Sequence, residues 1–107
     1  GVTSTMNVAA SGTVASLRVR VDINHTYQGD LEVALIGPDG TTVLLHNRTG
    51  TSTDNVKTVY PDLTAPAQAL TAFNGKAIAG AWKLRVRDLA AVDIGTLNFW
   101  ELDFRTQ

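Results

Sequence analysis

Cysteine is absent from all 107 residues of the sequence. Its absence excludes disulfide bonds, thiolate zinc sites and cysteine nucleophiles. It does not exclude secretion, because a chain of this length buries roughly two thirds of its unfolded surface and needs no covalent staple. The length fits one domain, and neither a linker nor an internal repeat is visible. We therefore expect a single domain over residues 1–107.

A strong excess of one charge is also missing. Nine Lys and Arg residues nearly balance ten Asp and Glu residues, which leaves a net charge of −1. Such a chain has no global field to hold nucleic acid or an acidic membrane. No apolar run approaches the ~20 residues that span a bilayer, so we expect neither kind of partner. The opening Gly1-Val2-Thr3-Ser4 carries no signal peptide and indicates a segment cut from a longer precursor.

Candidate catalytic residues are scarce. His25 and His46 are the two histidines, and no Gly-x-Ser-x-Gly motif surrounds a serine. A serine or threonine nucleophile needs a histidine beside it and an acid that orients the histidine. We expect His25 to be a hydrogen-bonded turn residue and His46 to lie on the surface. The sequence therefore predicts that the chain is not an enzyme.

Glutamate is equally scarce, because Glu32 and Glu101 are the two glutamates of the sequence. Paired carboxylates can cleave a glycosidic bond when they line a cleft. Both glutamates instead occupy the outward positions of alternating segments, and those positions usually face solvent in an antiparallel sheet. The sequence predicts a solvated sheet face on which they form cross-strand ion pairs with Arg and Lys.

What the sequence does contain is a persistent period of two. Leu17, Val19, Val21 and Ile23 alternate with charged residues, as in a strand with one wet face. Comparable alternation or β-rich composition recurs along the chain between turn residues. Together these patterns predict strands over residues 17–23, 31–35, 41–46, 56–60, 82–87 and 97–105.

Turn residues separate these strands. A proline-aspartate-glycine turn at residues 38–40 joins two of them, because proline presets φ and glycine accepts a positive φ. Leu97 and Phe99 fall out of phase with the rest of the last strand, which predicts a bulge near residues 98–100. Residues 61–75 indicate a long surface connection held by apolar contacts. The expected fold class is all-β: an antiparallel β-sandwich, jelly-roll-like, with seven to nine strands.

Aromatic residues make up 7% of the chain, which bears on carbohydrate binding. A sugar-binding sandwich needs exposed aromatic platforms. Trp82 and Trp100 fall on the apolar positions of their strands, which favours packing in the core. Tyr27 and Tyr60 are left as loop candidates for such a platform. A substrate-targeting or carbohydrate-binding module therefore stays open as the alternative function.

Three aspartates form a candidate metal set. Asp88 shares the inward phase of the apolar residues in its strand, where a charge is costly unless it is paired or bound to metal. Asp30 follows Gly29, and Asp93 lies five residues after Asp88. Calcium accepts several oxygen ligands from carboxylates and loop carbonyls. We predict Asp30, Asp88 and Asp93 as calcium ligands. The alternative is that Asp30 and Asp88 accept backbone N–H bonds in turns.

Five motifs follow one another along nearly the whole chain. They are Val19-x-Val21-x-Ile23-x-His25-Thr26-Tyr27-x-Gly29-Asp30-Leu31, Leu35-x-x-Pro38-x-Gly40-Thr41, Phe73-x-Gly75, Gly80-x-Trp82-x-Leu84-x-Val86-x-Asp88, and Asp93-x-Gly95-x-Leu97 with Trp100-x-Leu102. In this order and at these spacings they resemble the P domain, or P/Homo B domain, of proprotein convertases and bacterial secreted proteases.

The resemblance implies a jelly-roll β-sandwich without catalytic residues. It implies a C-terminal accessory domain that packs against a protease domain of the same precursor, aids its folding, and tunes its stability and its response to calcium and pH. In bacteria the implied partner is a subtilisin-like serine protease or a thermolysin-like zinc metalloprotease. The implied location is secreted or extracellular.

Overall fold

The computed structural model describes residues 2–24, 31–47, 56–88 and 96–106. These residues form seven strands and one short 3-10 helix, labelled η2. In chain order they are β1 (Val2–Val8), β2 (Val14–Asn24), β3 (Leu31–Ile36), β4 (Thr42–Asn47), β5 (Val56–Tyr60), η2 (Leu70–Phe73), β6 (Gly80–Asp88) and β7 (Thr96–Thr106).

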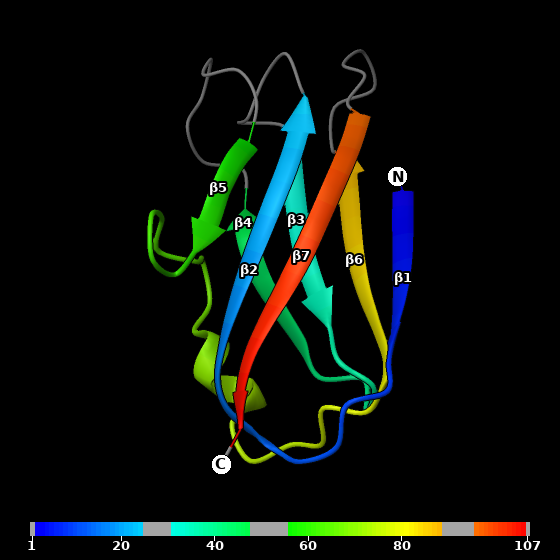
Figure 1. The fold of residues 1–107 in the computed structure, drawn as a ribbon. Helices are drawn as coiled ribbons and strands as arrows, with labels where there is room; N and C mark the ends of the chain where they lie inside the picture. Colours follow the sequence, from blue (N-terminus) through cyan, green and yellow to red (C-terminus); the bar gives the residue numbers. More distant parts are fainter. Residues whose placement is uncertain (1, 25–30, 48–55, 89–95, 107) are drawn as a thin grey trace.

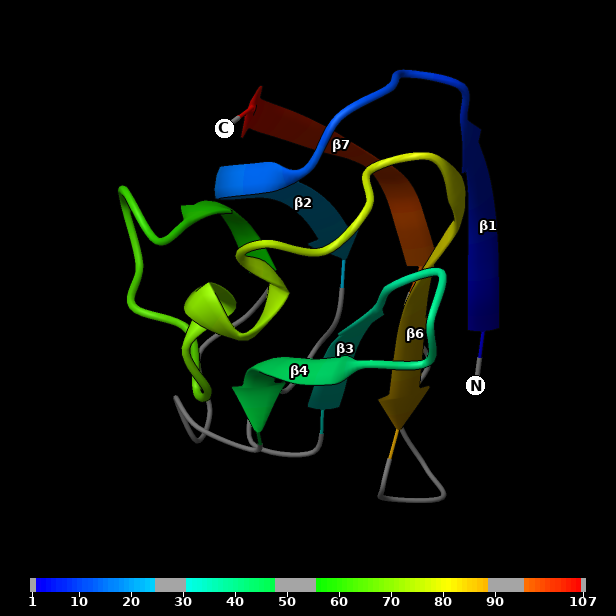
Figure 2. The same ribbon diagram turned by 90° about the horizontal axis from the view of Figure 1, so that it is seen from below.

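The strands form two antiparallel sheets. One sheet has four strands in the order β1-β6-β3-β4, and the other has three in the order β5-β2-β7. Figure 1 shows the three-stranded sheet in front of the four-stranded one, and Figure 2 shows the two layers from below. The predicted all-β antiparallel sandwich is confirmed. Its jelly-roll connectivity stays a prediction.

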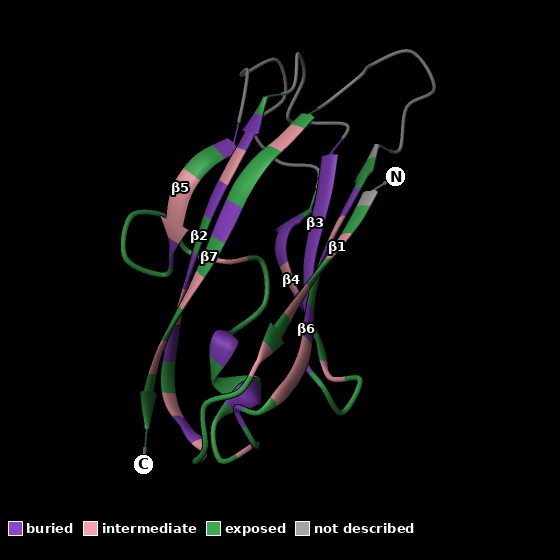
Figure 3. Cartoon of the chain, turned by 45° about the vertical axis from the view of Figure 1, so that its right-hand side comes forward, coloured by how far each residue is buried: buried purple, intermediate pink, exposed green. Residues whose placement is uncertain are grey.

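The core lies between the two sheets and follows the period of two. In β2, Val19, Val21 and Ile23 are buried, whereas Arg20 between them is exposed. Figure 3 shows the resulting alternation of buried and exposed bands along β2. Trp82 of β6 is completely buried. This alternation is the pattern that one buried sheet face imposes on a strand.

Two tryptophans connect the layers, as their apolar phase predicts. The Trp82 ring packs against Phe104 of the opposite sheet, with ring centroids 5.1 Å apart. Trp100 is 8% exposed, and its Nε1–H donates to Ser4 Oγ at 2.9 Å, which joins β7 to β1. Burying an indole is favourable when its N–H has an acceptor, so both rings belong to the core.

A bulge in β7 accounts for its change of phase. Asp22 pairs with Phe99 and Ile23 pairs with Leu97, so Asn98 is an extra residue in β7. The bulge returns Leu97 to the core side and leaves Phe99 on the outer face, where it is 43% exposed. The predicted bulge near residues 98–100 is confirmed.

A second bulge shows that the surface position expected for His46 is wrong. Val33 pairs with His46 and Ala34 pairs with Leu44, so Leu45 is the extra residue in β4. The inserted residue brings His46 opposite the buried Val33, and His46 is only 7% exposed. Strict alternation along β4 would place His46 on the outer face. The bulge reverses the phase of the residues that follow it, so His46 faces the core instead.

The connection between β5 and β6 closes the lower end of the sandwich (Figure 2). Leu70 and Phe73 of η2 are buried, and the Phe73 ring meets Trp82 edge-on at 5.1 Å. The backbone also holds this connection, since Val14 N–H donates to Lys76 O at 2.9 Å and Gly75 N–H donates to Val14 O at 2.8 Å. The expected surface connection held by apolar contacts is therefore observed.

The turn between β3 and β4 is tied to the same connection. Gly37 N–H donates to Thr41 O at 2.8 Å, and Gly40 takes a φ of 90°. Asp39 accepts a hydrogen bond from Lys76 Nζ at 2.8 Å and another from the Thr41 N–H at 2.9 Å. These bonds, that of Lys76 first, hold the pKa of the Asp39 carboxyl well below its ordinary value.

The expected loop position of Tyr60 is wrong as well. Tyr60 ends β5, pairs with Val19 and is 1% exposed. Its burial raises the pKa of the phenol from 10.0 to about 12, because desolvation disfavours the phenolate. Tyr60 therefore contributes to the core and is no part of an aromatic binding platform.

The raised pKa of Tyr60 gives a prediction for alkaline pH. The unfolded chain loses the phenolic proton near pH 10 and the folded chain near pH 12. The stabilising contribution is thus present below pH 10 and is lost as the pH rises towards 12, at about 1.4 kcal/mol per pH unit. Urea unfolding at pH 9, 10 and 11 should show this steeper loss in the native chain than in Tyr60→Phe. Parallel pH profiles for the two chains contradict the prediction.

Candidate functional site

Of the three predicted calcium ligands, the structure describes the position of one, Asp88, which ends β6. Leu31 at the start of β3 pairs with Asp88 at the end of β6, and Asn24 at the end of β2 pairs with Thr96 at the start of β7. Asp88 therefore lies next to the first residue of β3. The other two predicted ligands, Asp30 and Asp93, lie outside the described residues, as do His25 and Tyr27.

Within residues 2–24, 31–47, 56–88 and 96–106, no three or more His, Cys, Asp or Glu side chains gather as a metal group. Likewise, none of the helices in these ranges has the length and the apolar character to cross a bilayer.

Glu32 forms an ion-pair cluster on the outer face of the four-stranded sheet. Arg87, its cross-strand neighbour, donates to Glu32 Oε1 from both Nε, at 2.9 Å, and Nη2. Arg85 Nη2 lies 3.7 Å from the same oxygen. For Glu32 the predicted cross-strand ion pairing is observed, but its predicted solvation is wrong, because the residue is 9% exposed. For Glu101 the predicted ion pair is wrong, because it pairs with no cation among the described residues. The cluster is a structural ion pair between neighbouring strands.

Removing Arg87 should destabilise the chain. In Arg87→Ala the carboxylate of Glu32 keeps only the more distant Arg85, so we expect the free energy of unfolding to fall by about 1–3 kcal/mol. Lys83→Ala is the matched control, because Lys83 is exposed on the same face and pairs with no described acid. Urea unfolding at neutral pH measures both. Equal, small losses in the two variants show that the cluster contributes nothing to stability.

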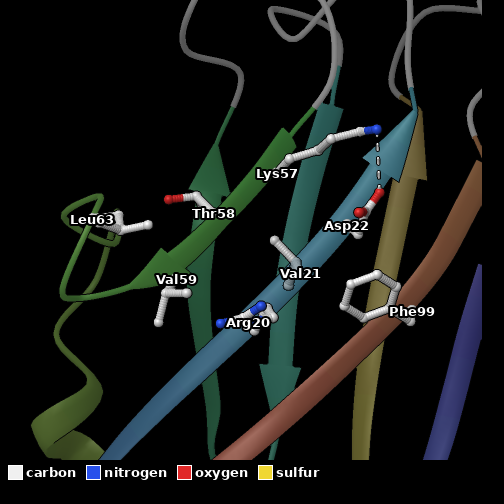
Figure 4. A pocket seen from close by; sticks show the side chains of 8 residues that line it. All are labelled: Arg20, Val21, Asp22, Lys57, Thr58, Val59, Leu63 and Phe99. Atoms are coloured by element: carbon white, nitrogen blue, oxygen red, sulfur yellow. Dashed lines mark ion pairs between the residues drawn. The ribbon is translucent and has the colours of Figure 1, made fainter.

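The outer face of the three-stranded sheet is hollowed. A groove of about 200 Å³, which we call the β2 groove, runs between β5 and β7 over the middle of β2. Figure 4 shows Leu63 at one side of it and Phe99 at the other, with Val21 between them. Its lining residues are Arg20, Val21, Asp22, Lys57, Thr58, Val59, Leu63 and Phe99.

Apolar exposure concentrates at this groove. Leu63 is 76% exposed and Phe99 is 43% exposed, and they are the two large apolar side chains that stand exposed among the described residues. Single exposed apolar residues are common, but two on one hollow are informative because apolar patches mark interaction sites.

The charges of the β2 groove are unevenly paired. Asp22 lies 3.7 Å from Lys57 Nζ and accepts a hydrogen bond from Asn98 Nδ2 at 2.9 Å. Arg20, at the centre of the sheet face, forms no ion pair with any residue that the structure describes. The groove thus holds two cations and one carboxylate, and the carboxylate is already engaged.

A second hollow of about 320 Å³ continues the groove along β2. It shares Arg20 and Val59 with the first hollow, so the two form one surface. Its other lining residues are Arg18, Glu101, Leu102 and Asp103, and Arg18 is paired with Asp62 at 3.2 Å. Neither hollow is lined by a histidine or a serine of the described residues. The sequence did not predict this surface, because Leu63 lies in the turn after β5 and Phe99 lies in β7, far away in the chain.

A comparison with known families identifies the chain. The family model described as the proprotein convertase P-domain matches residues 14–104. The chain belongs to the proprotein convertase P-domain family. The predicted resemblance is confirmed, and the matched range contains every strand from β2 onwards apart from the end of β7.

Proteases are among the curated relatives of this P-domain. It is 46% identical to leupeptin-inactivating enzyme 1 of Streptomyces exfoliatus over 90 residues, which cover 84% of this chain and 18% of the relative. It is 41% identical to a calcium-dependent protease of Nostoc sp. over 101 residues, 90% of this chain and 15% of the relative. It is 38% identical to the transglutaminase-activating metalloprotease of Streptomyces mobaraensis over 104 residues, 96% of this chain and 13% of the relative. The chain spans less than a fifth of each.

Solved structures agree on the fold. The serine protease of Aeromonas sobria in complex with a chaperone aligns with a TM-score of 0.65 at 20% identity, over 94% of this chain and 22% of that one. The same protease in a second crystal structure gives a TM-score of 0.58 at 22% identity, over 82% of this chain and 16% of that one. At these identities the likeness concerns the fold alone.

Proposed function

We propose that residues 1–107 form one non-catalytic accessory P-domain, C-terminal to the protease domain of a secreted protease, whose folding, stability and regulation it supports. The observation that carries the proposal is the family match over residues 14–104 together with the small share of each relative that it covers, 13–18%. The remaining length of those relatives leaves ample room for a catalytic domain in the same polypeptide.

The partner is a subtilisin-like or a thermolysin-like protease domain in the same precursor. One relative supports a protease partner by its name, transglutaminase-activating metalloprotease. The resemblance to P domains of exported proteases supports a secreted or extracellular location.

The folding role is tested by expressing the protease with and without this P-domain and measuring the yield of soluble, active enzyme. We expect the truncated protein to give a lower yield. An unchanged yield, together with retention of the P-domain on insoluble polysaccharide or protein substrate, supports the alternative of a targeting module and contradicts the proposal.

We propose in addition that the P-domain binds calcium through Asp30, Asp88 and Asp93. The donor set suits a hard cation, because all three side chains are carboxylates. The backbone supports it in part, since Asp88 pairs with Leu31, the residue that follows Asp30 in the sequence. Two relatives are also named calcium-dependent proteases.

Calcium should raise the thermal stability of the chain. A ligand that binds only the folded state adds about 2.7 kcal/mol when its free concentration is about 100 times the Kd, a Tm increase of roughly 10 °C for a chain of this size. Thermal melts in millimolar calcium and in chelator measure this increase, and Asp88→Asn and Asp30→Asn should diminish it. Asp103→Asn, at an exposed position of β7, is the matched control. A Tm that is independent of calcium contradicts the site.

A further inference from the structure

We infer that the β2 groove and its continuation along β2 form the surface on which this P-domain docks against the protease domain of its own precursor, at a patch that combines charges of both signs with apolar flanks. The inference rests on the proposed function and adds to it a face of the sandwich and the chemistry of the partner surface.

The apolar part of the argument is the meeting of Leu63 and Phe99 on one hollow. They come from different segments, the turn after β5 and strand β7, yet they flank the same groove (Figure 4). Phe99 lies outside because it neighbours the core residue Trp100 in β7, and the bulge at Asn98 returns only Leu97 to the core. Exposed apolar groups cost solubility and are retained where a partner covers them.

The charged part of the argument is Arg20. Arg20 lines both hollows, and it has no ion pair among the described residues. Glu101 is its cross-strand neighbour but does not approach within ion-pair distance. Arginine and aromatic side chains are the residue types that dominate interface energies. In the β2 groove, a cation in this position beside the half-exposed Lys57 favours a carboxylate on the partner, whereas Glu101 and Asp103 favour a cation opposite the continuation of the groove.

The outer face of the other sheet lacks these features. Its central cations, Arg85 and Arg87, are already directed at Glu32. Among the described residues of that face, none is a large apolar residue with an exposed side chain. The two outer faces therefore differ in what they leave unpaired, and the difference selects the three-stranded sheet as the docking face.

The occupant we assign is the neighbouring domain of the same chain. The relatives are each more than five times the length of their P-domain match, so a tethered neighbour is the most concentrated partner available. Tethering replaces a bimolecular encounter with an effective concentration in the millimolar range, so a groove of this modest size suffices for docking.

The direct test is lysine labelling of the native full-length protein with its active site inhibited. Lys57 lines the groove, Lys83 is exposed on the opposite sheet, and Lys76 has a 39% exposed side chain that is ion-paired with Asp39 at 2.8 Å. Lys76 thus controls for the Asp22 ion pair of Lys57. If the groove is covered about nine tenths of the time, Lys57 reacts with an amine-acylating reagent about tenfold more slowly than both controls.

Groove variants complete the test. Arg20→Glu combined with Phe99→Ser should restore labelling of Lys57 to the control rate, whereas Lys83→Glu, a charge reversal on the other face, should leave it slow. Equal labelling of all three lysines in the native protein overturns the inference. So does protection of Lys57 that rises with protein concentration, because that result assigns the groove to a second copy of the chain.

The two proposals fail separately. If removing the P-domain lowers the yield of active protease but Lys57 is labelled at the control rate, the function stands and this docking face is wrong. If Lys57 is protected but removal of the P-domain changes nothing, the groove docks the protease domain and the supporting function is wrong.

Discussion

Replacing Trp82 with alanine should lower the free energy of unfolding of the chain by about 3–5 kcal/mol. Trp82 has no exposed surface, and its indole N–H donates to Ile78 O at 2.8 Å in the interior. Its ring contacts Phe73 below and Phe104 across the sandwich. Removal leaves a cavity that neither sheet can close without shifting, and it also leaves a buried carbonyl without its donor.

Phe99→Ala is the matched control for Trp82→Ala in urea unfolding. It also deletes a large aromatic ring, but from a side chain that is 43% exposed on the outer face. We expect a loss of about 1 kcal/mol or less, because little buried area is given up. Comparable losses in the two variants contradict the assignment of Trp82 as the centre of the core.

Gly80→Ala should be the most damaging of the small substitutions, with a loss of about 3 kcal/mol or more. Gly80 takes a φ of 134°, which side-chain-bearing residues rarely adopt. A Cβ at this position meets Pro38 Cβ at 2.6 Å and Pro38 Cγ at 2.8 Å. The first residue of β6 therefore has to be glycine for the β3–β4 turn to pack beside it.

Gly40→Ala separates the two causes. Gly40 also has a positive φ, 90°, but a Cβ there meets no atom within 4 Å. Its loss should be about 1–2 kcal/mol, from backbone strain alone. Thermal or urea unfolding of both variants gives the contribution of the Pro38 contact as the difference. An equal loss in the two variants shows that Pro38 moves aside at no cost.

The strand assignments from sequence succeeded where the signal is local. Alternation in β2, β6 and β7 is a property of neighbouring residues, and it also located the bulge at Asn98. Strand β1 was missed, since Ser4 occupies a core-facing position opposite Leu84 and breaks the apolar pattern. A hydroxyl at this core-facing position is explained by the hydrogen bond that Ser4 Oγ accepts from Trp100, which is 96 residues away in the chain.

Burial of polar residues was the part that the sequence could not predict. Glu32 is outward by phase, and it is buried only because Arg87 and Arg85 of the adjacent strand cover it. His46 is buried because of a bulge in β4 that the local residue pattern does not predict. Both outcomes depend on the pairing of strands that are distant in the sequence, and a period of two carries no information about that pairing.

The same reasoning explains why the β2 groove was not foreseen. Arg20 and Phe99 belong to strands whose alternation marks them as outward, but their sharing of a hollow with Leu63 follows from the sheet order β5-β2-β7. The calcium prediction, by contrast, came from residue type and phase, and Asp30 and Asp93 lie outside the described residues.

The measurement that tests the central claim most directly is the thermal inactivation of the full-length protease beside a version that lacks this P-domain, with both proteins at equal concentration and in the same calcium buffer. Support by the P-domain predicts a lower inactivation temperature and a shorter half-life for the truncated enzyme. Identical inactivation of the two proteins contradicts the account.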